Sequence, residues 1–351
     1  HPHAEKLAKI DRAQSRFRGT TLAGLLLEES KKSMPADFKK AYELAEAADA
    51  ILNRSSASPG VADLHARAAA YMGNACRRLD NVQGAHQFFT FSRSIIRSQG
   101  VTDPLVYAEI DSCEAVLHMD QRRFAKAEEL LTRSIALYAL AGAEEQAAHP
   151  LVTLGLMYYH QGNNLKAIEA TRNATEYIKR DHDLRLYVCA RYNLALFLCE
   201  AGHFSASAET LLVDREMFRQ FDDLYTTLRV VWLEGKLAAG FKQEAEAEKA
   251  FAAAREGFIT QGCGYDAAMV SLDLAILLLR QGRTVEVQEL AEEMQQIFEA
   301  EDVHREALAA LLLFQESARE EQLTVEAVQR LSEYLKAARS NSALRFRSPQ
   351  L

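Results

Sequence analysis

The chain has 351 residues, of which 48% are hydrophobic, and its 41 basic and 49 acidic residues give a net charge of −8. A protein that binds nucleic acid directly usually presents a basic face, so the acidic excess argues against that class. Only six prolines and sixteen glycines are available for turns, while Ala, Leu, Glu and Arg are plentiful, which favours an all-α protein.

The N-terminal segment begins with His1 rather than Met and carries no secretory signal. We expect residues 1–20 to form a tail or helix, compatible with a cut from a longer protein that has an upstream domain. No later run approaches the roughly 18 apolar residues of a membrane helix, so no membrane partner is predicted. Five cysteines without a Cys-x-x-Cys pair indicate small buried thiols in a reducing compartment, hence a cytoplasmic protein.

From residue 21 onward, small residues recur with a fixed period of 40 positions. They stand at Ala127, Ala167, Ser207, Ala247 and Ala327, with Val287 in the remaining slot. Twelve positions before most of these stands a second small residue, at Gly73, Ala115, Gly155, Ala195, Gly235 and Ala275. Such a period predicts helices that pack closely in pairs and stack into an array.

The unit around Gly155 shows the pattern most clearly. Its first helix places Leu151, Leu154, Gly155 and Tyr158 on one face. Gly162 then ends the helix, because glycine accepts the left-handed conformation of a helix stop. The same pattern predicts eight units in chain order, the first and last weak, over 38–48, 73–92, 115–131, 151–174, 194–211, 235–254, 274–291 and 318–327.

Two helix boundaries need separate treatment. Pro150 falls within the first helix of its unit when counted from its equivalents one period later. Either that helix begins late, near His149, or it continues through the proline and bends there. At the other end, a polar helix over 324–339 is expected to cap the array.

The unit pattern resembles the tetratricopeptide repeat, in which small residues fill the tight helix contacts and a glycine closes the turn. The residues that carry the resemblance are Gly155, Tyr158, Gly162, Ala167 and Ala174, with Phe124, Phe204 and Phe251 at aromatic slots. The period of 40 departs from the usual value of about 34. Such long units resemble those of bacterial peptide-sensing regulators and multi-helical adaptor proteins, and the full chain resembles uncharacterised bacterial tetratricopeptide proteins.

The resemblance implies a right-handed superhelical solenoid of about eight antiparallel helix pairs over residues 21–340, followed by a C-terminal tail over 341–351. It also implies that the first helix of each unit lines a concave face. The inward positions counted along these helices give the candidate groove residues Tyr159, Tyr192, Asn193, Leu196, Arg229, Trp232, Lys236, Leu272 and Ile276. Aromatic and aliphatic side chains beside Arg229 and Lys236 are typical of a surface that binds a peptide with an acidic group.

The alternative for Tyr192 and Trp232, that they pack as core residues between neighbouring units, stays open. Chemistry-bearing motifs are scarce: no phosphate-binding loop, dinucleotide fingerprint or HExxH motif occurs. We therefore predict no cofactor, no bound metal and no catalytic residue. Asp181-His182-Asp183 is interpreted as a solvated loop rather than a metal site, and 262–266 as a helix end followed by a helix start.

These observations predict a non-enzymatic scaffold that binds a protein or peptide on the concave face, in bacterial regulation or signalling. The alternative is a signal-peptide-gated regulator that controls an attached or partner effector of the DNA-binding, anti-sigma or protease type. A third class, an enzyme built on helical repeats, lacks a recognisable constellation of residues.

Overall fold

The computed structural model describes residues 19–56, 58–101, 103–180, 182–220, 223–300, 314, 318 and 323–338. Within these ranges the chain forms sixteen α-helices and no strand, which confirms the predicted all-α class. The expected tail over 341–351 lies outside the described residues, as does the segment over 1–20 except for its last two positions. No helix in the described part of the chain has the length and apolar character needed to cross a membrane.

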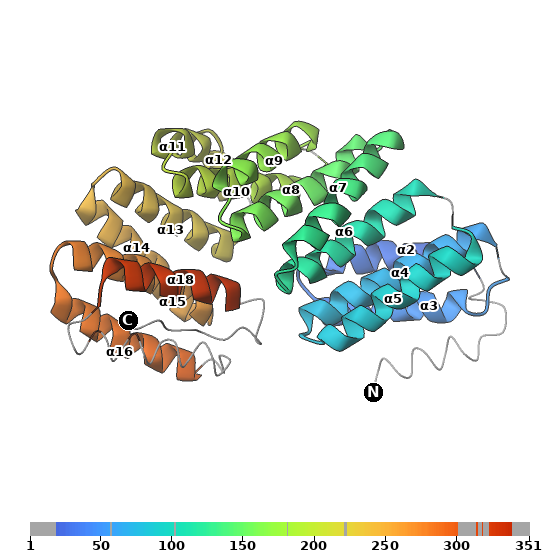
Figure 1. Ribbon diagram of the computed structural model, residues 1–351, viewed down its shortest axis with the longest axis horizontal. Helices are drawn as coiled ribbons and strands as arrows, with labels where there is room; N and C mark the ends of the chain where they lie inside the picture. The colour runs from blue at the N-terminus through green and yellow to red at the C-terminus, as the bar shows by residue number, and fades with distance from the viewer. Residues whose placement is uncertain are drawn as a thin grey trace. The chain divides into compact units, whose positions relative to one another are not determined.

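The chain divides into two compact units, His1–Met157 and Tyr158–Leu351, here called unit 1 and unit 2. Unit 1 holds three helical hairpins (Figure 1). They are α2 (Thr20–Ser33) with α3 (Phe38–Leu52), α4 (Pro59–Arg78) with α5 (Val82–Gln99), and α6 (Pro104–Asp120) with α7 (Phe124–Leu140). The next helix, α8 (Glu144–His160), begins in unit 1 and ends in unit 2.

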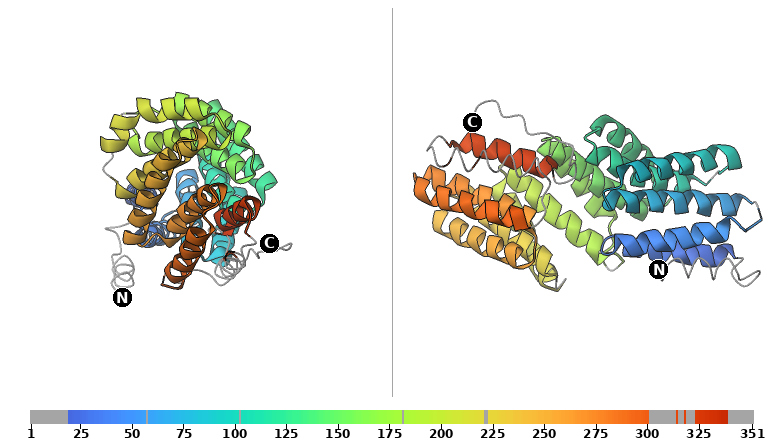
Figure 2. Two further views of the ribbon diagram at one scale, coloured as in Figure 1. Left: turned by 90° about the vertical axis from the view of Figure 1, so that its left-hand side faces the viewer. Right: turned by 90° about the horizontal axis from the view of Figure 1, so that it is seen from below.

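Unit 2 holds the helices that are coloured from green through yellow and orange to red (Figure 2). Its helices are α9 (Asn164–Tyr177), α10 (Leu184–Glu200), α11 (Phe204–Val213), α12 (Arg215–Gln220), α13 (Leu224–Gly240), α14 (Glu244–Thr260), α15 (Gly264–Arg280), α16 (Thr284–Ala300) and α18 (Val325–Ala338). The described residues thus contain seven helix pairs, the short helix α12 and α18, close to the eight pairs predicted. The stacked-hairpin architecture is confirmed.

Turns between paired helices repeat one backbone geometry. At Gly162 the backbone is left-handed, with φ of 77°, and the next N–H, of Asn163, donates to the Tyr158 carbonyl at 2.9 Å. This bond from the residue after the turn to the carbonyl five positions back satisfies an orphan group of the helix end. Left-handed residues recur at the same place in six hairpins, at Asp80, Arg122, Gly162, Gly202, Lys242 and Gly282. The predicted turn glycines are confirmed, and three hairpins use other residues.

The small residues of the 40-residue period lie where paired helices touch. Ala127, Ala167 and Ala247 are all 0% exposed. Ser207 is equally buried, and its hydroxyl donates to the Ala195 carbonyl on the facing helix at 2.6 Å. A Cβ added to Gly235 would lie 2.7 Å from the Phe251 ring. These positions are small because larger side chains would separate the helices.

Helix α8 decides between the two alternatives for Pro150. The helix begins at Glu144 and contains Pro150 in its interior, so the predicted late start near His149 is wrong. Six residues precede the proline within the helix. Because Pro150 has no N–H, one backbone hydrogen bond is missing there, but the helix continues to His160.

The predicted polar cap over 324–339 is present as α18, but it is not polar throughout. Its N-terminus is capped by Thr324, whose hydroxyl accepts from the Ala327 N–H at 3.2 Å. Val328, Leu331 and Leu335 are at most 2% exposed and join the core cluster that α15 and α16 build. The expectation of a polar cap is therefore corrected, because one face of α18 extends the core and only the other meets solvent.

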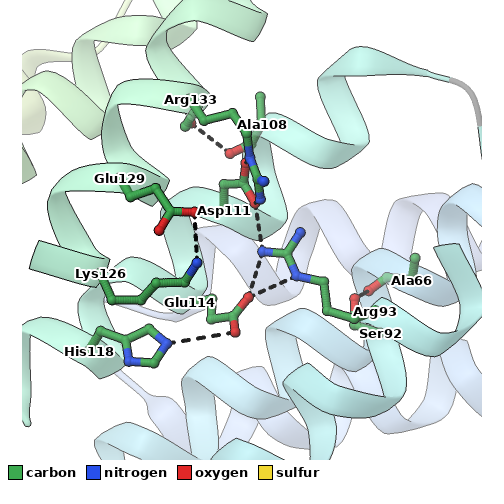
Figure 3. Close-up of polar contacts among 11 residues, drawn as sticks. Ala66, Ser92, Arg93, Ala108, Asp111, Glu114, His118, Lys126, Glu129 and Arg133 are labelled. Atoms are coloured by element: carbon green, nitrogen blue, oxygen red, sulfur yellow. Dashed lines mark hydrogen bonds and ion pairs between the residues drawn. The ribbon is translucent and has the colours of Figure 1, made fainter. Parts of the chain in front are cut away.

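A buried ion network joins three helices of unit 1 (Figure 3). The Asp111 carboxylate on α6 is completely buried and lies 2.6 Å from Arg93 Nη2 on α5 and 2.6 Å from Arg133 Nε on α7. Arg93 also donates to Glu114 on α6, through Nε at 2.8 Å. Arg93 therefore joins the α4–α5 hairpin to α6, and Arg133 joins the two helices of the α6–α7 hairpin through the same carboxylate.

Candidate functional site

First helices of unit 2 line a cavity of about 460 Å³. Residues from α10, α13, α15 and α18 form most of its wall, among them Glu200, Lys236, Asp273, Ile276 and Lys336. The wall therefore combines acidic, basic and aliphatic groups. The predicted groove residues Lys236 and Ile276 belong to it.

Lys236 on α13 lies at the centre of a group of four side chains that we call the Lys236 cluster: Glu200, Trp232, Lys236 and Asp273. Its ammonium nitrogen lies 2.9 Å from Glu200 Oε1 and 3.0 Å from Asp273 Oδ2. The Trp232 indole N–H donates to Asp273 Oδ2 at 2.7 Å. Helices α10, α13 and α15 are thus joined through one lysine.

The charges in the Lys236 cluster stabilise one another. Burial alone would lower the pKa of the Lys236 ammonium, but Asp273 and Glu200 outweigh it and raise that pKa well above its usual value. Burial would likewise raise the pKa of the Glu200 carboxyl, but Lys236 and Lys336 outweigh it and lower that pKa to about 2. At neutral pH Glu200 and Lys236 are therefore both charged, and the Lys236 ammonium lies between the carboxyl groups of Glu200 and Asp273.

Tyr159, at the end of α8, links the cavity to α18. Its ring stacks on Phe197 of α10 with centroids 4.9 Å apart, and Lys336 Nζ lies 5.8 Å from its centroid. Burial raises the pKa of the Tyr159 hydroxyl, so it stays a neutral donor and acceptor. Through Lys336, α18 therefore contacts Tyr159 of α8, whose ring stacks on Phe197 of α10.

A second group of predicted residues lies beside the Lys236 cluster, and we call Cys189, Tyr192, Asn193, Tyr225 and Arg229 the Arg229 patch. The Arg229 guanidinium on α13 lies 4.0 Å above the Tyr192 ring of α10 and 5.9 Å from the Tyr225 ring. The Tyr192 hydroxyl donates to the Arg229 carbonyl at 3.3 Å. Cys189, one turn before Asn193, is exposed, contrary to the expectation that the thiols are buried.

The remaining predicted groove residues differ in exposure. Leu196 and Ile276 are half-buried, as are Trp232 and Arg229. Tyr192 and Asn193 are each 4% exposed and Leu272 is 0% exposed, so these three present little or no surface to a ligand. For Tyr192 this favours the core alternative, whereas Trp232 is only half-buried.

Glu200, Asp273 and Lys336 are the site residues that the sequence analysis missed. Asp273 stands 80 positions after Asn193, which is two periods. The two residues are therefore equivalent, and since Asn193 was a candidate groove residue, Asp273 could have been predicted as one. Glu200 is equivalent to His160, one period earlier, and to Arg280, two periods later. A polar residue thus recurs at this position in three units, which was also a signal. Lys336 stands nine positions after Ala327, as Glu256 stands after Ala247, so a polar residue was predictable there but its contact with the cavity was not.

The segments considered for metal or nucleotide binding have structural roles. Asp183 caps α10 by accepting from the Leu186 N–H at 2.8 Å, and Asp181 lies outside the described residues. Gly262 is left-handed with φ of 65°, and α15 begins two residues later, so the helix end and helix start predicted there are confirmed. Among the residues that the structure describes, no group of three His, Cys, Asp or Glu side chains is placed to hold a metal ion.

Comparison with known proteins identifies structures with a similar fold. No protein-family model and no curated protein matches the sequence. The chain is similar to a Rap protein complexed with Competence and Sporulation Factor, with a TM-score of 0.68 and 15% identity over 92% of this chain and 88% of that one. It is also similar to the apo form of RapI, with a TM-score of 0.66 and 12% identity over 90% and 87% of the two chains.

A third similar structure is NprR in complex with its cognate peptide NprX, with a TM-score of 0.58 and 12% identity over 92% of this chain and 94% of that one. At such low identities the similarity shows a common fold and nothing about the residues of a site. That fold is the stacked helix-pair architecture described above.

Proposed function

Because this chain is a tetratricopeptide-like helical repeat protein, we propose that it is a non-enzymatic scaffold that binds a peptide or protein segment on the first helices of unit 2. The observation that carries the proposal is the cavity of about 460 Å³, whose wall places aliphatic and charged side chains from four helices together. Ligand sites combine apolar surface with fixed polar groups, and this wall provides both, with Ile276 and Leu277 beside Lys236 and Lys336. The similar NprR structure holds a cognate peptide, which supports a peptide as the ligand class.

The proposal extends to regulation, since a bound peptide changes the stability of the unit that holds it. As a peptide-gated regulator, the chain would control an attached or partner effector. A cytoplasmic location is part of the proposal and is supported by five cysteines that are all free thiols.

Affinity selection tests the proposal. The full chain is incubated with a pool of synthetic random heptapeptides that have free ends, and bound peptides are identified by mass spectrometry. Fluorescent copies of the enriched peptides then give Kd values by anisotropy. Ile276→Glu, which places a charge in the cavity wall, is expected to weaken binding at least tenfold because burying an unpaired carboxylate is unfavourable.

The matched control is Val285→Glu, the same kind of change at a residue of α16 that is 64% exposed, and it should bind as the unmodified chain does. Failure to enrich any peptide, or equal binding by Ile276→Glu with unchanged circular dichroism, contradicts the proposal. Hydrogen exchange with and without peptide tests regulation: a gated regulator changes exchange in residues 1–157, whereas a passive scaffold changes it only in unit 2.

A further inference from the structure

Helix α18 forms one part of the wall of the unit 2 cavity. Its polar face contributes Gln329, Ser332, Glu333 and Lys336, at the spacing of a single helical face. Its apolar face packs on α15, and the two helices lie side by side (Figure 1). In the described part of the chain, no comparable packing joins α18 to α10 or α13, which form other parts of the wall. The contact of α18 with that side of the cavity is therefore made by side chains.

Lys336 makes such a contact. Its ammonium nitrogen lies 5.8 Å from the centroid of the Tyr159 ring, and the Tyr159 hydroxyl accepts a hydrogen bond from it. Burial alone would lower the pKa of the Lys336 ammonium, but Tyr159 and Glu200 outweigh it and raise that pKa. The lysine is therefore held in its charged form beside residues of α8 and α10.

Tyr159 and Lys336 belong to opposite ends of unit 2. Tyr159 stands near the end of α8, where unit 2 begins, and α18 is the last helix that the structure describes. In a helical repeat array each unit contacts the units next to it, so a contact between the two ends is unusual. It completes a ring in which α8, α10, α13, α15 and α18 each contact the next helix.

The Lys336–Tyr159 contact is the joint of this ring that is most sensitive to the curvature of unit 2. Small rotations between successive helix pairs add up along an array, so a slight change at each pair becomes a large displacement between the two ends. The joints α10–α13, α13–α15 and α15–α18 consist of packed helices. The joint between α18 and α8 contains a hydrogen bond from a long side chain, which a small displacement breaks.

We propose that the Lys336–Tyr159 contact is a reversible closure of the unit 2 cavity, and that its opening frees the C-terminal end of α18 and admits the ligand. The inference goes beyond the proposed function, because it assigns the movable element of the site. Lys336 is then a residue that controls access to the cavity.

Hydrogen exchange of the full chain without ligand tests whether this contact holds α18. Lys336→Met keeps the length of the side chain without its charge, and Tyr159→Phe keeps the ring that stacks on Phe197 without its hydroxyl. In each variant the amides of α18 should exchange about tenfold faster, because loss of the contact favours the open state, while those of α13 exchange as before. The double variant should exchange no faster than either single variant, since both changes remove the same contact.

Arg330→Met and Tyr177→Phe are the matched controls. Arg330 is exposed on α18 outside the cavity wall, and Tyr177 is 37% exposed at the end of α9. Both variants should leave the exchange of α18 unchanged. Unchanged exchange in Lys336→Met overturns the inference. Additive effects of Lys336→Met and Tyr159→Phe in the double variant also overturn it, because they indicate two independent structural defects.

Fluorescence quenching tests whether the same contact controls access to the cavity. Trp232 is the only tryptophan of the chain, and its indole N–H donates to Asp273, which lines the cavity. Acrylamide, a small neutral quencher, should quench Trp232 about twofold more strongly in Lys336→Met and Tyr159→Phe, because a cavity that opens more often admits the quencher more often. Unchanged quenching in variants whose α18 exchanges faster would show that α18 moves without opening the cavity, which overturns the inference.

Both measurements are made without a peptide, so they decide the inference whether or not the heptapeptide pool yields a ligand. A failure of the inference is therefore distinguishable from a failure of the proposed function. For a peptide that the pool does yield, the association rate should rise about tenfold in Lys336→Met, because entry no longer waits for the contact to open. An unchanged association rate would contradict the control of access.

Discussion

Three hairpin turns hold a residue with a side chain in the left-handed conformation. These are Asp80, Arg122 and Lys242, with φ of 56°, 57° and 61°, at the place where Gly162, Gly202 and Gly282 close the other turns. A left-handed backbone costs an L-residue about 1–2 kcal/mol because its Cβ approaches the following carbonyl. The fold therefore accepts a local strain in half of these turns.

Replacing the strained residue should raise stability. For Lys242→Gly we expect a gain of about 0.5–1 kcal/mol in the free energy of unfolding, because the relieved strain exceeds the added freedom of the unfolded chain. Urea unfolding followed by circular dichroism measures it. The reverse change, Gly202→Ala, puts a Cβ at φ of 79° and should lose about 1 kcal/mol. No difference between the two variants would show that these turns are unstrained.

Glu200 gives the fold a specific acid sensitivity. Its pKa lies at about 2 in the folded chain against an ordinary value of 4.5, so its ionised form stabilises the fold above pH 4.5, and that contribution is lost as pH falls toward 2. Glu200→Gln removes this titration. The stability of the variant, from urea unfolding at a series of pH values, should fall less steeply between pH 4.5 and 2, and parallel curves would contradict the assignment.

At the scale of elements, ion pairs join neighbouring hairpins in addition to apolar contacts. Asp111 accepts from Arg93 on α5 and Arg133 on α7 and is completely buried (Figure 3). In unit 2 a comparable ion pair lies at a helix break. Asp214, which pairs with Arg191, stands between α11 and α12. The pairing joins residues 23 positions apart, so a local pattern could not reveal it.

Removing the shared carboxylate should loosen unit 1. Asp111→Ala leaves two arginines without their buried partner, and we expect a loss of about 3–5 kcal/mol in the free energy of unfolding. The control is Glu129→Ala, which removes an exposed carboxylate that contacts Lys126 at 2.7 Å and should leave the stability nearly unchanged, because surface ion pairs contribute little. Thermal unfolding of both variants checks this, and equal midpoints would rule out a special role for Asp111.

At the scale of the whole molecule, the sequence predicted the architecture and only part of the site. The spacing of Ala167, Ser207 and Ala247 fixed which positions touch between paired helices, because a period of 40 repeats one packing arrangement. The partners of Lys236 were not predictable in this way. Glu200 and Asp273 lie 36 and 37 positions from it, and whether they meet depends on how far neighbouring first helices slide along each other.

The buried face of α18 has a consequence for how such a chain lengthens in evolution. Arrays of this kind grow by duplication of whole units, since each unit packs only on its neighbours. Val328, Leu331 and Leu335 fill the surface of α15 and α16 on which a further hairpin would pack. A duplicated unit of 40 residues would therefore be inserted before α18. The helix would remain the last one of the array however many units preceded it.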